Sequence, residues 1–261
     1  MNGASGSGVS RRKREARAAM KGKIRIAVAG WSIPKDCAAR FPGDGGHLER
    51  YAQVMRAVEI NSSFYRPHRP RTYGRWAASV PPDFRFAVKM PREISHIRCL
   101  AQSREPLLRF LDETAHLGEK RGPLLLQLPP SLTFDETAAA AFFETSRALH
   151  EGPIACEPRH PSWFADDADA IFKAFRIARV GADPPRARGA DLPGGWRAST
   201  YLRLHGSPKI YYSAYGERRL RAIAAMIERA PSHVSWCVFD NTAEGEAVHD
   251  ALALTRLLNE A

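Results

Sequence analysis

The chain has 261 residues, of which 44% are hydrophobic and 26% are charged, and its formal net charge is +11. This composition is ordinary for a globular protein, and the length suits one large domain or two small ones. No run of 18 apolar residues occurs, so the sequence predicts no membrane-spanning helix and no membrane partner.

The first 23 residues predict a disordered basic tail. They contain seven Lys or Arg and one Glu, a charge of +6, which leaves +5 for the remaining 238 residues. The tail lacks the apolar stretch of a secretory signal. A basic tail can contact nucleic acid, although a solvated leader has the same composition. The remainder is only moderately basic, which weakens an argument for nucleic-acid binding from overall charge.

Short apolar runs, each typical of a buried strand, follow the tail at intervals. They cover residues 23–30, 57–64, 84–90, 123–129, 153–160, 177–184, 200–206 and 234–241. Helical spacing of apolar residues lies between several of them and after the last, at 105–118, 134–150, 217–230 and 246–260. The Pro- and Gly-rich segment 183–199 predicts a loop instead.

Alternating strands and helices favour a parallel sheet, and eight strands in this length fit a (β/α)8 TIM barrel. We therefore predict one α/β barrel domain over residues 24–261. A doubly wound open sheet is the alternative. That fold usually has a glycine-rich turn after its first strand, whereas here the first run continues into Gly-Trp-Ser-Ile-Pro at 30–34.

Polar residues recur where these apolar runs end. In the run 57–64, Glu59 and Asn61 share one face of the strand, and the helix-facing side of a barrel cannot accept a carboxylate without a partner. In the run 200–206, Tyr201, Arg203 and His205 share a face opposite two leucines. We therefore expect these polar side chains to point into the barrel near the carboxyl ends of its strands, where barrel enzymes place their chemistry.

The acid–base groups of this ring are the candidate catalytic residues Glu59, Glu157, His205 and Asp240. The candidate substrate-binding residues are Asn61, Tyr65, Lys89, Gln127, Arg159, Trp163, Arg203 and Asn241. Guanidinium groups suit bidentate binding of phosphate or carboxylate. The two glutamates offer a general base and, if burial raises one pKa, a general acid. A histidine titrates near neutral pH and can transfer protons.

The cofactor requirement is open, and a divalent metal is the weaker expectation. Glu157, Asp183, His205 and Asp240 together offer the oxygen and imidazole ligands that suit zinc, manganese or magnesium. No His-Glu-x-x-His or comparable spacing supports such a site. The four cysteines form no C-x-x-C pair, so no zinc finger, iron–sulfur site or disulfide framework is indicated, and we expect a reduced cytoplasmic protein.

The same segments carry a family resemblance. They are GWSIP (30–34), VEINSSFY (58–65), FAVKMPREISH (86–96), LGEKRGPLLLQLPPSL (117–132), EPRHPSW (157–163), YLRLHG (201–206) and FDNTAEGEAVHDA (239–251). Their order and spacing resemble domain-of-unknown-function family 72, the YecE-like family, over roughly residues 24–257. The resemblance implies a TIM-barrel-like fold and no established reaction. Ala29 and Ile33 depart from the family pattern, both in the first loop.

Three functions remain open at this point. The first is an enzyme that binds a small anionic or phosphate-bearing substrate and performs acid–base or hydrolytic chemistry, for which a phosphodiesterase-like hydrolase is one form. The second is a nucleic-acid-binding protein without catalysis, which uses the tail and a basic rim. The third is a barrel whose charge ring is purely structural, because Glu59, Glu157 and Asp240 balance Lys89, Arg159 and Arg203 in formal charge.

Overall fold

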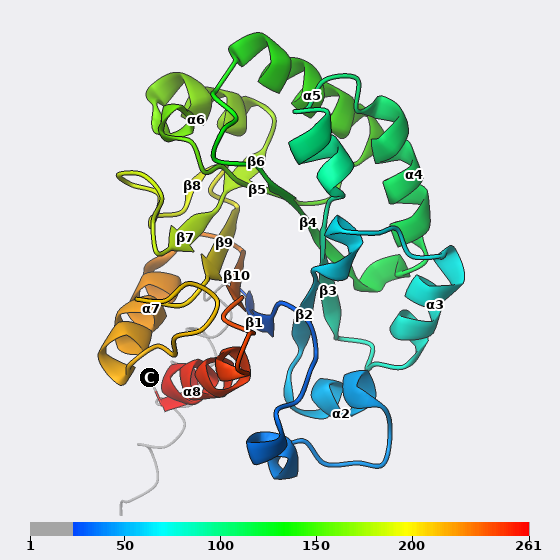
Figure 1. The fold of residues 1–261 in the computed structure, drawn as a ribbon, viewed down its shortest axis with the longest axis vertical. Coiled ribbons are helices and arrows are strands. Elements are labelled where there is room, and N and C mark those ends of the chain that lie inside the picture. The colour runs from blue at the N-terminus through cyan, green and yellow to red at the C-terminus, as the bar shows by residue number, and fades with distance from the viewer. Residues whose placement is uncertain (1–22, 261) are drawn as a thin grey trace, which may run out of the picture.

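The computed structural model describes residues 23–260, which form a mixed α/β fold with parallel sheets. Apart from Lys23, the predicted basic tail lies outside the described residues. Figure 1 shows the strands gathered around a common centre with the helices outside them. Each of the eight apolar runs predicted from the sequence contains at least one strand.

The strands are β1 (Lys23–Val28), β2 (Ala57–Ile60), β3 (Arg85–Lys89), β4 (Arg121–Gln127), β5 (Ile154–Glu157), β6 (Ile177–Arg179), β7 (Gly181–Asp183), β8 (Gly194–Gly195), β9 (Ser199–Leu204) and β10 (Val234–Phe239). The α-helices are α2 (His47–Val54), α3 (Pro70–Ala78), α4 (Arg104–Ala115), α5 (Glu136–Leu149), α6 (Asp166–Ala174), α7 (Glu217–Arg229) and α8 (Glu246–Glu260). Shorter helical turns are η1 (Lys35–Arg40), η2 (Ser62–Phe64), η3 (Glu93–Ile97), η4 (Gly118–Lys120) and η5 (Pro161–Phe164).

Two sheets contain these strands. One has the order β1-β10-β9-β7 and the other the order β2-β3-β4-β5-β6-β8, and only the short β8 is antiparallel to its neighbour. The sheets adjoin at two places. Ala29, just after β1, forms a parallel bridge with Glu59, and the Gly30 N–H donates to the Glu59 carbonyl at 2.9 Å. Val180 alone separates β6 from β7, and its N–H donates to the Cys156 carbonyl at 2.8 Å.

The structure differs from the sequence prediction in the run 177–184. The prediction is one strand, whereas β6 pairs with β5 and β7 pairs with β9. The chain therefore passes from one sheet to the other within this run. The segment 183–199 is mostly loop, as expected, but it also contributes β8, which pairs with β6. The two glycines of β8 allow a close approach there, because a Cβ on Gly195 would lie 2.5 Å from the Ile177 carbonyl.

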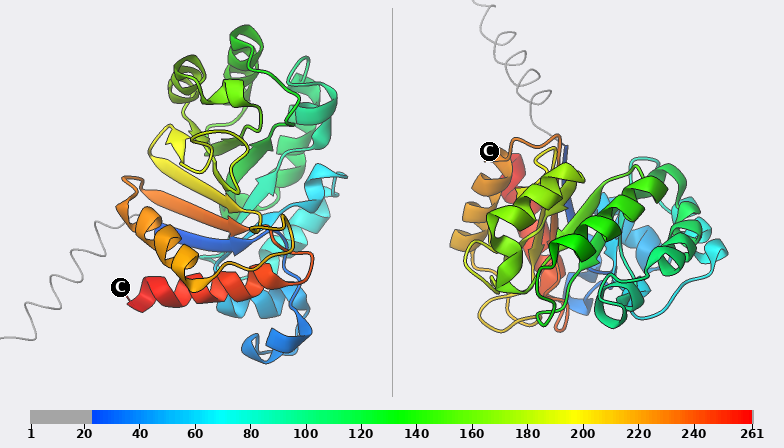
Figure 2. Two further views of the ribbon diagram at one scale, coloured as in Figure 1. Left: turned by 60° about the vertical axis from the view of Figure 1, so that its left-hand side comes forward. Right: turned by 90° about the horizontal axis from the view of Figure 1, so that it is seen from above.

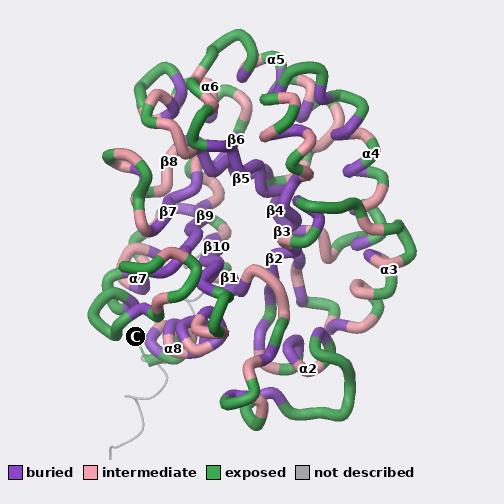
Figure 3. Tube along the Cα trace, in the orientation of Figure 1, coloured by how far each residue is buried: buried purple, intermediate pink, exposed green. Residues whose placement is uncertain are grey.

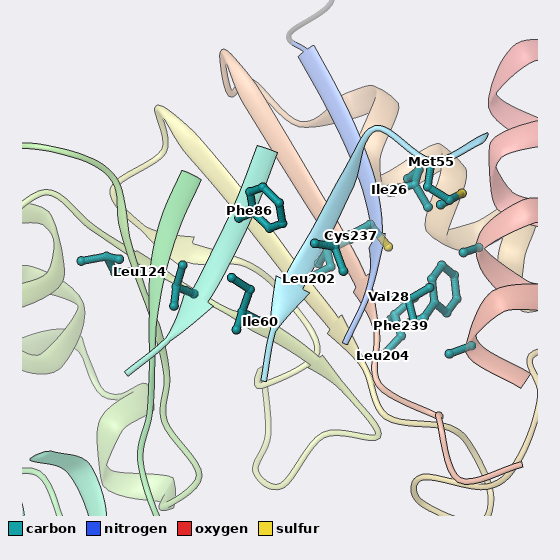
Figure 4. Packing of buried hydrophobic residues seen from close by; sticks show 14 of the residues in the cluster. Ile26, Val28, Met55, Ile60, Phe86, Leu124, Leu202, Leu204, Cys237 and Phe239 are labelled. Atoms are coloured by element: carbon teal, nitrogen blue, oxygen red, sulfur yellow. The ribbon is translucent and has the colours of Figure 1, made fainter. Parts of the chain in front are cut away.

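Side chains alternate between two packing environments along the strands. The outward residues form the larger apolar cluster with the helices, for example Val28, Ile60, Phe86, Leu204 and Phe239 (Figure 4). The inward residues form a second, smaller cluster, which consists of Ala27, Ala57, Ala87, Leu125, Ala155, Ala178, Val180, Tyr201, Trp236 and Val238. Burial is accordingly greatest along the strands at the centre, and exposed residues lie towards the periphery (Figure 3).

The helices cover the outer faces of the strands. Figure 2 shows α7 and α8 side by side along the sheet that contains β1, β9 and β10. None of the helices within residues 23–260 is long and apolar enough to cross a membrane. The inward face of the strands is apolar along its middle, where the smaller cluster lies, and becomes polar towards the two ends of the strands. The predicted site lies at the carboxyl end.

Candidate functional site

The inward alternation continues to the carboxyl ends of the strands, where it brings charged residues together. Glu59 ends the inward row of β2, Lys89 that of β3 and Glu157 that of β5. On β9 the inward row runs from Tyr201 to Arg203. These side chains are all buried, and their polar groups therefore require partners from neighbouring strands.

Arg203 lies at the centre of this network and is 0% exposed. Its Nε donates to Glu59 Oε2 at 3.1 Å, and its Nη2 donates to Glu59 Oε1 at 2.8 Å. Its Nη1 donates to Glu157 Oε2 at 2.7 Å, and Nη2 also donates to Asp240 Oδ2 at 3.1 Å. Every guanidinium nitrogen is thus committed to a carboxylate. Burial opposes the charge, but the three carboxylates hold the Arg203 pKa well above its ordinary value.

Glu59 completes its contacts with Tyr201, a residue absent from the predicted site. The Tyr201 hydroxyl donates to Glu59 Oε2 at 2.8 Å. The signal for this contact was present in the sequence, because the alternation places Tyr201 on the same face as Arg203. Glu59, Tyr201 and Arg203 are each 0% exposed, so this half of the network is closed to solvent.

Glu157 is the second centre, and its Oε1 accepts three hydrogen bonds. The donors are Gln127 Nε2 at 3.1 Å and Arg159 Nε at 2.9 Å, and His205 Nε2 lies at 3.2 Å. A glutamate would serve as a general acid if burial raised its pKa, and Glu157 does not meet this condition. Burial does act in that direction, but Arg203, His205 and Arg159 outweigh it and hold the Glu157 pKa well below its usual range.

His205 lies between two carboxylates. Its Nδ1 is 3.0 Å from Asp240 Oδ2, and its Nε2 contacts Glu157 as described. Burial lowers the His205 pKa, but the charge of Glu157 and the hydrogen bonds to both carboxylates raise it above the ordinary value. Burial likewise opposes ionisation of Asp240, but Arg203 and His205 lower the Asp240 pKa overall. The arrangement therefore favours an imidazolium flanked by two ionised carboxylates.

Two cations of the site keep unused donors. Lys89 is 4% exposed and its Nζ lies 4.2 Å from the centre of the Phe64 ring, but within residues 23–260 it has no hydrogen bond or ion pair. Burial and the nearby Arg203 lower the Lys89 pKa to about 8, although carboxylates oppose this shift. Arg159 uses only its Nε, so its two terminal nitrogens have no partner in the described part of the chain.

The remaining predicted residues lie outside this network. Tyr65 is 69% exposed. Trp163 is 1% exposed, donates to the Leu132 carbonyl and stacks on Phe172, so it is a core residue. Asn241 donates to Asp250 Oδ2 at 2.7 Å, which ties the end of β10 to α8. Asn61 Oδ1 and Asn241 Oδ1 are both buried without a hydrogen-bond partner among the described residues.

The residues named for a metal do not converge as a set. Asp183 Oδ2 pairs with Arg219 Nε at 3.0 Å, and both His205 nitrogens already contact carboxylates. Within residues 23–260, a group of potential ligand atoms within 4.8 Å of one another is instead formed by Asp36, Cys37 and His249. This group lies at η1 and α8, away from the Arg203 network, and Asp36 within it is exposed.

The entrance to the network is narrow. A cavity of about 10 Å³ is lined by Glu157, Arg159 and His205 together with the following loop. In this loop the Tyr211 ring packs edge-on against His205, with ring centres 5.9 Å apart. Tyr211 itself is 40% exposed. Arg159 and Tyr211 therefore lie at this cavity together with Glu157 and His205.

Relatives of this chain share its sequence in part. The chain is 32% identical over 142 residues to "UPF0759 protein YecE" of Escherichia coli (strain K12), which is 54% of this chain and 50% of that protein. The matched region thus spans about half the length of this relative. The chain is also 24% identical over 200 residues to "UPF0759 protein YunF" of Bacillus subtilis (strain 168), with 71% of each chain covered.

Solved structures share the fold. A DUF72 family protein from Thermotoga maritima MSB8 is similar with a TM-score of 0.75 and 21% identity, covering 91% of this chain and 99% of that one. A DUF72 family protein from Enterococcus faecalis V583 is similar with a TM-score of 0.75 and 20% identity, covering 90% and 95% respectively. The family described as "Protein of unknown function DUF72" matches residues 25–261, so the chain belongs to the DUF72 family.

Proposed function

We propose that this protein is an enzyme that binds a small phosphate-bearing or other anionic substrate at the carboxyl ends of its strands. Arg159 and Lys89 hold the anion, and Glu157, His205 and Asp240 supply acid–base or hydrolytic chemistry. The observation that carries the proposal is the pair of cations with unused donors. Among the described residues Lys89 Nζ has no hydrogen bond and the two terminal nitrogens of Arg159 have no partner, and such buried donors are costly unless a ligand completes them.

The protonation states suggest which group does what. The His205 pKa is raised, so its imidazole carries a proton near neutral pH and serves as the acid. The Glu157 pKa is lowered, so this carboxylate stays ionised and stabilises the imidazolium. Arg203 acts as a positioning residue, because its nitrogens all donate to the carboxylates that flank the site.

A purely structural role fits only part of the ring. Glu59, Tyr201 and Arg203 are fully buried and satisfied by one another, which supports a structural role for them. Lys89 and Arg159 do not fit that interpretation. We also propose that the two sheets close into one (β/α)8 barrel, which is supported by their contacts at Ala29–Glu59 and at Val180.

The test is a thermal-shift screen with inorganic phosphate, sugar phosphates, nucleotides and short DNA or RNA, each without and with magnesium, manganese or zinc. A ligand at about 100 times its dissociation constant stabilises the fold by about 2.7 kcal/mol. For a domain of this size that corresponds to a rise in melting temperature of roughly 5–10 °C. We expect this rise for the wild type and not for Arg159→Gln.

Two further variants serve as controls. Arg221→Gln removes an exposed arginine of α7 that pairs with Glu217, and it should respond to the ligand as the wild type does. Arg203→Met breaks a buried ion network and should cost on the order of 3–5 kcal/mol of stability whether or not a ligand binds. If no compound shifts the wild type, or if every compound that does so shifts Arg159→Gln equally, the proposed site is wrong.

A further inference from the structure

A second and larger cavity lies at the opposite end of the strands. Its volume is about 650 Å³, and residues at or just before the amino ends of β1, β3, β4, β5, β9 and β10 line it. Cavities that hold small organic ligands measure about 300–1,000 Å³. The Arg203 network lies at the carboxyl ends of the same parallel strands, so the two sites are distinct.

The lining of this cavity is strongly basic. Its Lys and Arg residues are Lys23, Arg25, Arg85, Arg121, Arg147 and Arg176, and the only carboxylate among the described lining residues is Glu151. These residues come from distant parts of the sequence, and the fold brings them together because parallel strands begin at the same end of the sheet. The surplus of positive charge produces a positive electrostatic potential in the cavity, which favours the binding of anions.

Three of the arginines donate hydrogen bonds from one terminal nitrogen, Nη1, and their other guanidinium nitrogens have no hydrogen bond within residues 23–260. Arg25 Nη1 donates to two backbone carbonyls at 2.8 and 3.2 Å, and Arg85 Nη1 donates to two more, each at 2.8 Å. Arg121 Nη1 donates to the Leu111 carbonyl at 3.2 Å. The Nε and Nη2 groups of all three make no hydrogen bond within residues 23–260. The guanidinium groups are therefore oriented in advance, with donors left for a ligand.

The positive charge at this end is only partly offset by the surrounding carboxylates. Burial and the nearby Arg85 lower the Arg25 pKa, and Asp83 opposes them without reversing the shift. Burial also lowers the pKa of His150, which packs nearby, and Arg121 and Arg147 contribute to bring it to about 4. Like charges that depress one another indicate that a bound anion would be stabilised here.

The cavity also has a flat apolar wall. Trp236 lines it, is 3% exposed, and stacks on Tyr201 with ring centres 6.1 Å apart and planes 5° apart. Gly122 allows this position of the indole, because a Cβ there would lie 2.8 Å from the Trp236 ring. A second indole, that of Trp196, is half-buried in the lining. Trp236 is too buried to offer a free face, so Trp196 is the aromatic side chain here that can stack on a planar ligand.

We propose that this cavity is a binding site for an anion that joins a phosphate or carboxylate to a flat apolar ring. Arg25, Arg85 and Arg121 receive the anionic group, and Trp196 receives the ring, while the buried Trp236 forms part of the apolar wall. A nucleoside 5′-phosphate has this chemistry, either as a free molecule or as the end of a single nucleic-acid strand. The site is separate from the one proposed above and does not depend on it.

Isothermal titration calorimetry of the full chain tests the proposal with adenosine 5′-monophosphate, inorganic phosphate, adenosine and a 5′-phosphorylated DNA dodecamer. We expect saturable binding of the monophosphate, with phosphate and adenosine each much weaker. Binding of the dodecamer through its phosphorylated end, lost in an unphosphorylated dodecamer, would identify the nucleic-acid source instead and also supports the site.

Paired variants separate binding from folding. Arg85→Gln with Arg121→Gln should weaken the monophosphate at least tenfold, since each removes a charge-assisted hydrogen bond. Lys23→Gln with Arg176→Gln provides a second test, because these exposed side chains make no hydrogen bond or ion pair within the described residues and their loss leaves the fold intact. We expect a several-fold loss there. Arg159→Gln and Arg221→Gln should bind as the wild type does.

Three results would overturn the proposal. The first is the absence of saturable binding of any of these probes to the wild type. The second is unchanged affinity in both basic-cavity variants. The third is loss of binding in Arg159→Gln, which would assign the ligand to the carboxyl end of the strands. If only Arg159→Gln loses binding of the monophosphate, the site at the carboxyl ends of the strands still stands and the basic-cavity proposal fails. The two proposals therefore fail independently.

Discussion

At the scale of single residues, Arg203 and Arg159 show how similar side chains on neighbouring inward positions take different roles. Arg203 is 0% exposed and all its nitrogens donate to carboxylates. Arg159 is partly exposed, and within residues 23–260 only its Nε donates a hydrogen bond, to Glu157. A buried ion pair contributes little net stability relative to an apolar pair, but loss of one partner leaves an uncompensated buried charge. Arg203 therefore orders the site, and Arg159 remains available to bind.

Lys89 makes a pH-dependent contribution that can be measured. Its pKa is about 8 in the folded protein, against an ordinary value of 10.5 for a lysine. Between these pH values the folded state binds fewer protons than the unfolded state, so the free energy of unfolding should rise as the pH rises from 8 to 10.5. We expect the wild type to gain up to about 3 kcal/mol relative to Lys89→Met over this window.

Urea unfolding of both proteins at several pH values, from about 7 to about 10.5, measures this difference. The comparison cancels the titration of every group that the two proteins share and that Lys89 does not affect. If the free energies of unfolding of the wild type and Lys89→Met change with pH in parallel, the Lys89 pKa is not lowered. If the wild type loses stability relative to Lys89→Met as the pH rises, the Lys89 pKa is raised instead.

At the scale of elements, the loop between β9 and α7 lines the cavity at the carboxyl ends of the strands. It begins at Gly206, whose φ of +92° lies in the left-handed region. The Gly206 N–H donates to the Tyr215 hydroxyl at 2.9 Å, and Tyr211 of the same loop packs on His205. A Cβ on Gly206 would lie 2.9 Å from the Ser213 carbonyl. Glycine is therefore required both by the backbone angle and by the close approach.

Substitution of Gly206 should displace this loop. We expect Gly206→Ala to lower the free energy of unfolding by about 2–3 kcal/mol, because strain and a backbone clash act together. The matched control is Gly118→Ala. Gly118 has a φ of +55°, but a Cβ added there would have no atom within 4 Å, so only strain of about 1 kcal/mol applies. Urea titration of both variants measures the difference. Equal losses would show that the close contact at Gly206 relaxes freely.

At the scale of the whole molecule, the proposed barrel depends on the two places where the sheets adjoin. Open sheets expose edge strands, whereas a closed barrel has none. The Gly30 amide donates from one sheet to the other at 2.9 Å, so its exchange with solvent reports whether that junction stays closed. The Val180 amide donates at 2.8 Å to Cys156 of β5, within the sheet that contains β6, and therefore serves as a reference for an intact strand pair.

Native-state hydrogen exchange followed by NMR tests closure directly. In a closed barrel the Gly30 amide should be protected to within about tenfold of the Val180 amide and of the central Leu202 amide on β9. Arg186 provides a fast-exchanging reference, because it is exposed and its amide has no backbone hydrogen bond within residues 23–260. If the Gly30 amide exchanges as fast as this reference while Leu202 stays protected, the sheets separate at this junction and the molecule is not one closed barrel.

The sequence by itself determined the local features of this protein. All eight apolar runs contain strands, and the alternation within each run correctly assigns Glu59, Glu157 and Arg203 to the polar, inward face. The family was also identifiable from the motifs, and the match over residues 25–261 confirms it. These features depend on neighbouring residues, because the strand period of two is a property of the backbone itself.

Only the tertiary structure decided which polar groups are satisfied by one another. Arg203 and Glu59 are 144 residues apart, and no local pattern states that they meet or that Arg159 keeps free donors. For the same reason, the sequence did not predict that Trp163 is buried in the core or that a basic cavity lies at the amino ends of the strands. Contacts of this kind arise where distant strands converge, so they depend on the closing of the fold and not on the sequence around each residue.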